Sequence, residues 1–99
     1  MAKRSISWDE KAWQDFINIL EYIRDESPEN VIRVSNRISN IIHTIPEFPE
    51  MYKQDDLKAK NDGSFRVFIQ DRIRISYQIT PKKIYIAGVR HTSQEPLEY

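Results

Sequence analysis

The spacing of hydrophobic residues changes near the middle of this 99-residue chain, and that change constrains the fold more than any other feature. In the first half they recur every three or four residues, which is typical of amphipathic helices. From Phe65 onward they alternate with polar residues, which is typical of strands. The order predicts an α+β fold in one domain, residues 1–99: an N-terminal helical hairpin packed on a mostly antiparallel sheet of about four strands.

Two helices are predicted in the first half of the chain. Ser7 and Glu10 form a capping-box pattern that starts the first helix, which runs to about Asp25. Ser27-Pro28 starts the second helix, with Ser as N-cap and Pro at the first helical position, and Pro46 ends it. Because only a few residues separate the two apolar stripes, we expect the helices to pair as an antiparallel hairpin.

Strands are expected at the N-terminus and throughout the second half. Their ranges are Lys3–Ser7, Phe65–Gln70, Arg72–Ile79 and Ile84–Val89. Gln70-Asp71 and Pro81-Lys82 are the predicted turns. Because Ile84–Val89 is apolar on both faces, we expect it to occupy a central position in the sheet.

Basic charge is concentrated in one part of a chain whose net charge is zero. Residues 1–52 contain six Lys/Arg against nine Asp/Glu, residues 53–90 contain nine against four, and residues 91–99 contain none against two. If the isoleucine-rich strand faces meet the helices, the opposite face is exposed and polar. That face would carry Arg66, Arg72, Arg74, Ser76 and Gln78. We therefore take it as the candidate site.

Several classes of site are excluded by residue types that the chain lacks. The absence of cysteine excludes disulfides, thiolate zinc sites and thiol catalysis, and it favours a reducing cytoplasm. Gly63 and Gly88 are the only glycines, so no phosphate-binding glycine loop is possible. His43 and His91 belong to different predicted elements without a supporting ligand cluster. We expect no metal, no cofactor, no signal peptide and no membrane span.

A resemblance to a known family covers nearly the whole chain. It is carried by Trp8, Ala12 and Phe16 on the first helix, by Phe65-Arg66, by the strand Ile73–Ile79 with its Arg74-to-Tyr77 pattern, and by the ending Arg90–Tyr99. These features together resemble the RelE/ParE superfamily. The resemblance implies a small toxin that is neutralised by an antitoxin encoded beside it. RelE-like members cut messenger RNA in the ribosomal A site without a metal, whereas ParE-like members poison DNA gyrase.

The RelE-like alternative assigns catalytic roles to particular residues. Metal-free RNA cleavage needs a base for the 2′-hydroxyl, an acid for the leaving oxygen and positive charge on the phosphate. By resemblance, Arg74 contacts the phosphate, Tyr99 stacks on a base or assists proton transfer, and Glu50 supplies a loop carboxylate. His91 is the proposed proton-transfer group, and on the parity of Tyr85 it could reach the basic face.

Further basic residues are candidates for binding the RNA. They are Arg66, Arg72, Arg90, Lys58 and Lys60. The alternative for the strand arginines is that they are merely solvated. Phe68 and Gln70 stand where RelE-like sites carry further basic residues, which weakens the case for cleavage.

The expected partners depend on which of these two alternatives holds. The antitoxin is expected in both, with an acidic, amphipathic segment that lies on the helices and covers the basic sheet face. The other partners are the ribosome and messenger RNA in the RelE-like alternative, or DNA gyrase in the ParE-like one. A degenerate toxin that binds only its antitoxin is a third possibility.

Overall fold

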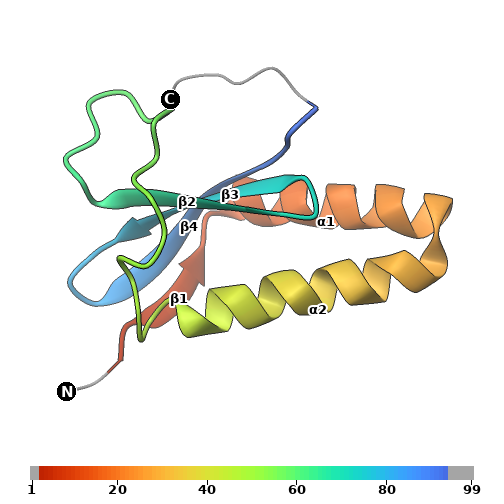
Figure 1. Ribbon diagram of the computed structural model, residues 1–99, viewed down its shortest axis with the longest axis horizontal. Helices are drawn as coiled ribbons and strands as arrows, with labels where there is room; N and C mark the ends of the chain where they lie inside the picture. The colour runs from red at the N-terminus through yellow and green to blue at the C-terminus, as the bar shows by residue number, and fades with distance from the viewer. Residues whose placement is uncertain (1–2, 94–99) are drawn as a thin grey trace.

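A computed structural model describes residues 3–93, and it has the predicted α+β architecture. Six elements follow one another along the chain: β1 (Ser5–Trp8), α1 (Glu10–Glu26), α2 (Pro28–Thr44), β2 (Phe65–Gln70), β3 (Ile73–Ile79) and β4 (Lys83–His91). The two helices form an antiparallel hairpin on one side of the sheet (Figure 1). The sheet order is β1-β4-β3-β2, and only the β1–β4 pair is parallel. The apolar strand β4 is therefore central, as predicted.

The helix boundaries differ from the prediction at one end. Asp9, and not Ser7, caps α1, because its carboxylate accepts a hydrogen bond from the backbone N–H of Ala12 at 3.0 Å. Ser7 cannot serve as the cap because it is still extended and pairs with Tyr85 in β4. Ser27 ends α1 and precedes α2, with Pro28 at the first helical position as expected.

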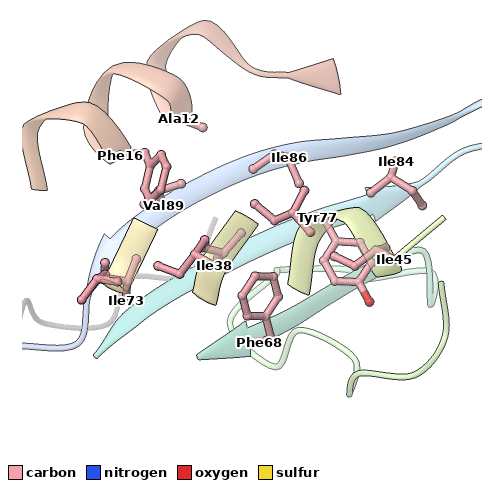
Figure 2. Close-up of a cluster of buried hydrophobic side chains, with 13 residues drawn as sticks. Ala12, Phe16, Ile38, Ile45, Phe68, Ile73, Tyr77, Ile84, Ile86 and Val89 are labelled. Atoms are coloured by element: carbon pink, nitrogen blue, oxygen red, sulfur yellow. The ribbon is translucent and has the colours of Figure 1, made fainter. Parts of the chain in front are cut away.

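The hydrophobic core lies between the sheet and the helical hairpin (Figure 2). Its fully buried members include Ile38 from α2, Ile75 and Tyr77 from β3, and Ile86 from β4. The stripe on α1 contributes less than expected, because Ala12 and Phe16 are buried whereas Trp13 is 47% exposed.

The β2–β3 turn is formed by Asp71 and Arg72, one residue later than predicted. Both residues have positive φ, 53° and 64°, which suits the right-handed twist of a two-residue hairpin. This turn lies at the same end of the sheet as the C-terminal end of β4 (Figure 1). Arg72 therefore belongs to the turn and not to the flat face of the sheet.

Strand register corrects the predicted distribution of side chains between the two sheet faces. Arg66 pairs with Tyr77, and Phe68 with Ile75, so Arg66 lies on the helix side together with the core. The prediction that Arg66 shares a face with Arg74 is therefore wrong. The buried Phe68 gives the physical reason, because burying its ring against the helices turns the neighbouring even-numbered residues of β2 toward the same side.

A β-bulge reverses the alternation within β4. Tyr77 pairs with Ile86 and Ser76 with Gly88, so Ala87 has no partner in β3. As a result Arg90 faces the same side as Arg74, whereas His91 pairs with Ile73 on the helix side. The prediction that His91 keeps the parity of Tyr85 is wrong for this reason.

Candidate functional site

The sheet face opposite the helices, which we call the open face, is partly covered by residues 53–64. This segment runs along the edge of β2: the Asp55 N–H donates to the Phe65 carbonyl at 2.9 Å, and the Val67 N–H donates to the Lys53 carbonyl at 3.0 Å. Val67 lies on the open face and is only 1% exposed. The open face is therefore not a bare basic surface.

Asp55 fastens this segment to the sheet. Its carboxylate is fully buried and accepts hydrogen bonds from the Arg74 guanidinium at 2.7 Å and from the Ser76 hydroxyl at 2.8 Å. The N–H of Leu57 donates to the same carboxylate at 3.0 Å. These three donors compensate a charge that could not otherwise be buried.

Arg74 is engaged by two carboxylates at once. Besides Asp55 it contacts Asp56 at 3.2 Å, and its side chain is only 15% exposed. The hydrogen bond from Arg74, followed by the charge of Lys53, lowers the pKa of Asp56 from its usual value. The positive charge expected on this face is thus largely neutralised within the chain.

The rest of the segment is organised around Asn61. Its amide group donates to the carbonyls of Asp55 and Phe65, and its side-chain oxygen accepts from the N–H groups of Gly63 and Phe65. Gly63 has φ of 99°, a conformation that favours glycine. The proposed RNA-binding residue Lys58 lies over the Phe65 ring, 4.9 Å from its centre, while Lys60 is exposed.

A pocket of about 190 Å³ opens where β1 ends and α1 begins. Its walls are the first turns of α1, Leu57, and the strand residues Arg74, Ser76 and Ala87–Arg90. Asp9 stands at its edge, where it accepts a hydrogen bond from the Tyr85 hydroxyl at 2.9 Å. The hydrogen bond from the backbone of Ala12, then that from Tyr85, lowers the pKa of Asp9. Asp9 and Asp15 offset the cations of this pocket, so it is not a purely basic site.

The proposed catalytic residues do not converge on this pocket. Arg74 and Arg90 line it, but Arg66 lies on the helix side, where it donates to the Tyr52 carbonyl at 3.0 Å. His91, also on the helix side, is within hydrogen-bonding distance of Ser93 at 2.8 Å. Glu50 is exposed in the loop after α2. Tyr99 lies outside the described residues.

The helix side holds one buried phenol. The Tyr77 hydroxyl donates to the Pro49 carbonyl at 2.8 Å, which ties the loop after α2 to the core. Burial raises the pKa of Tyr77 to about 12. A group that stays protonated in this way is suited to structure rather than to proton transfer at neutral pH.

A second concavity, which we call the helix groove, lies between α1, α2 and β1. Its volume is about 310 Å³, and it is lined by Ile6, Trp8, Trp13, Phe16, Ser35, Ile38, Ser39, Ile42 and His43. Trp8 stacks on Phe16 with 5.4 Å between ring centres and meets the edge of Trp13 at 5.1 Å. The groove is mainly aromatic and aliphatic, and its rim carries two serines and His43.

Two of the residues that organise these sites were not predicted from the sequence. Asp55 is one aspartate in a polar stretch, and nothing in its spacing separates it from Asp56. The bulge at Ala87 had a signal, because a glycine directly after it within an apolar strand suggests such an irregularity. Within residues 3–93 no group of three potential metal ligands is present, and none of the helices described is long and apolar enough to cross a membrane.

Comparison with known proteins agrees with this architecture. A solved structure described as the chromosomal ParDE toxin–antitoxin system from P. aeruginosa aligns with a TM-score of 0.69 over 90% of this chain and 96% of the other, at 14% identity. That likeness concerns the fold. No curated protein matches the chain. The family of ParE toxins of type II toxin–antitoxin systems, parDE, matches residues 6–96. The chain therefore belongs to the ParE toxin family.

Proposed function

We propose that this ParE-family toxin acts by binding DNA gyrase and does not cut messenger RNA. Membership of the family implies an antitoxin partner, and the superfamily resemblance implies one of two targets. The observation that carries the proposal is the double engagement of Arg74 by Asp55 and Asp56.

An RNA phosphate would have to compete with those carboxylates for Arg74. Because the Asp55 side chain is fully buried, removing its cationic partner would leave an uncompensated charge, at a cost of about 3–5 kcal/mol in comparable pairs. Metal-free cleavage also needs a base and an acid on either side of the phosphate. Arg66 and His91, the other candidates, face the helix side of the sheet.

The surfaces that remain accessible suit contacts with proteins. Trp13 in the helix groove is 47% exposed, and a large aromatic side chain at the mouth of an apolar groove is a common anchor in protein interfaces. We propose that the antitoxin inserts apolar side chains of an amphipathic segment here. Its acidic residues would then compete with Asp15 for Lys11, whose side chain is 81% exposed beside the pocket on the open face.

The test is expression of the wild type and of His91→Ala without antitoxin, with an SOS reporter and primer extension on a reporter messenger RNA read in parallel. We expect a raised SOS signal, intact RNA and equal toxicity of the two proteins. Purified toxin should also inhibit supercoiling by purified gyrase. Ribosome-dependent cleavage that is lost in His91→Ala would overturn the proposal in favour of the RelE-like alternative.

Two variants on α1 test whether the antitoxin binds in the helix groove. Trp13→Ala should weaken antitoxin binding by about tenfold or more, as expected for an interface anchor. Tyr22→Ala, on the same helix and 67% exposed outside the groove, should leave antitoxin binding unchanged. Normal growth on expression of the wild type alone would instead indicate a chain that has kept only its antitoxin partner.

A further inference from the structure

The exposed face of α2 differs in charge and composition from that of α1. Arg33, Asn36, Arg37 and Asn40 are all exposed, and their spacing places them on one face of the helix. Glu29, in the first turn, is the only carboxylate of α2, whereas α1 contains five. The middle of α2 therefore presents guanidinium and amide groups without neighbouring acids on the same helix.

The β2–β3 turn brings a third arginine to this face. Arg37 binds Asp71 through two parallel hydrogen bonds of 2.8 Å, which anchors the turn against α2. The Arg37 guanidinium lowers the pKa of Asp71, and the charge of Arg33 contributes in the same direction. Arg72 follows Asp71 directly, so the turn that Arg37 anchors also carries Arg72, and we call Arg33, Arg37 and Arg72 the arginine cluster.

The hairpin needs the backbone conformation of Arg72, but that conformation favours glycine over arginine. Its φ of 64° lies in the left-handed region, where two-residue turns strongly favour glycine. Its carbonyl accepts a hydrogen bond from Thr92, but any residue could provide that group. The side chain is exposed and forms no ion pair within residues 3–93, and the same holds for Arg33. Because the turn requires this backbone conformation but no arginine side chain, a strained arginine at this position points to a role outside the chain.

We propose that the arginine cluster binds the phosphate backbone of duplex DNA. Guanidinium groups match phosphate oxygens in planar, two-pronged geometry, and asparagine amides donate to the same backbone. Arg33 to Asn40 spans about 10 Å along the helix. Side chains at the two ends of that length can therefore reach neighbouring phosphates of one strand. The toxin would bind DNA without gyrase. Any role of that binding in the inhibition of gyrase rests on the proposed function.

The affinity should be modest and sensitive to salt. The chain has no net charge, so long-range attraction is weak. Arg37 is already paired with Asp71, so Arg33 and Arg72 are the main cations available to release counterions. Two phosphate contacts predict that raising the salt from about 50 to about 200 mM weakens binding by about tenfold.

The test measures fluorescence anisotropy of a labelled duplex of about 20 base pairs with purified toxin. Arg33→Ser/Arg72→Gly should weaken binding by about tenfold and reduce the salt dependence. Lys82→Ser/Lys83→Ser removes the same net charge from exposed positions at the opposite end of the sheet, and should change the affinity by less than about twofold. The Arg72→Gly change relieves backbone strain, so weaker binding by the first variant would not reflect poor folding.

Three outcomes would overturn the inference. They are equal loss in the two double variants, wild-type affinity in Arg33→Ser/Arg72→Gly, and competition by duplex RNA that equals or exceeds that of DNA. Failure of the proposed function has a different signature, because wild-type toxin would then leave supercoiling by gyrase unaffected whether or not it binds DNA.

Discussion

The two faces of the sheet are stabilised by different kinds of interaction. On the helix side, isoleucines and Tyr77 are buried against the helices, and among residues 3–93 the only ionisable group in the buried centre of that core is a neutral phenol. On the open face, residues 53–64 are fastened by the charges of Asp55 and Arg74. Hydrophobic burial depends little on pH, whereas a network of carboxylates depends on their ionisation.

This difference predicts opposite sensitivities to pH. The pKa of Asp56 is lowered by Arg74, so its contribution is present above the usual pKa of an aspartate and is lost as the pH falls. The pKa of Tyr77 is raised, so its contribution is lost as the pH rises. Acid should therefore loosen the open face first, and alkali the helix side.

The largest expected loss of stability comes from a substitution on the helix side of the sheet. Ile38 is fully buried, and Ile38→Ala should lower the free energy of unfolding by about 4 kcal/mol, because it removes buried methyl groups and leaves a cavity. Chemical denaturation measures this change. Ile32→Ala on the same helix, where the side chain is 64% exposed, should cost less than about 0.5 kcal/mol. Similar losses in both variants would contradict the burial of Ile38.

The second largest expected loss of stability comes from a substitution on the open face. Asp55→Ala should cost about 3 kcal/mol, because it leaves the nearly buried Arg74 with only an exposed carboxylate as partner and Ser76 without an acceptor. Hydrogen exchange should then increase at the amides of Asp55 and Val67 more than in the helices. Asp56→Ala is the matched control at the adjacent position, where 68% of the side chain is exposed, and it should destabilise the fold much less than Asp55→Ala because water screens the exposed ion pair. Equal costs would mean that Asp55 does not fasten the segment.

The elements of the fold could be predicted from the sequence because they depend on local patterns. The helical stripes containing Phe16 and Ile38, and the alternation around Ile75, follow directly from the spacing of apolar residues. The central position of β4 followed from its two apolar faces. These features require no knowledge of which residues meet across the molecule.

The candidate site was less predictable because it depends on register. Whether Arg66 and His91 share a face with Arg74 is decided by the pairing of β2 with β3 and by the bulge at Ala87. A shift of one residue exchanges the two faces of a strand. Asp55 acquires its role only through Arg74 and Ser76, which lie 19 and 21 residues away in sequence. No local pattern carries that information.

The helix side should lose stability in alkali because of Tyr77. In the unfolded chain a tyrosine ionises near pH 10, whereas Tyr77 in the folded protein ionises near 12. Its contribution is complete below pH 10 and declines by roughly 2 kcal/mol as the pH rises toward 12. Denaturation at a series of pH values should show this decline in the wild type, and Tyr77→Phe should remove that part of it. An identical decline in Tyr77→Phe would assign the pH dependence to other groups.

The smallest expected change in stability comes from a substitution in the β2–β3 turn, where stability and DNA binding should change in opposite directions. Arg72→Gly should raise the free energy of unfolding by up to about 1 kcal/mol, because glycine adopts a φ of 64° without the strain of a side chain. In a domain of this size that gain raises the melting temperature by a few degrees. Asp71→Gly relieves the same kind of strain but removes the partner of Arg37, so its net effect should be smaller or negative. If Arg72→Gly instead lowers the melting temperature, the arginine side chain supports the fold and needs no DNA contact to explain its presence in the turn. If the variant is more stable and binds DNA less well, the chain keeps a strained arginine for a contact outside itself.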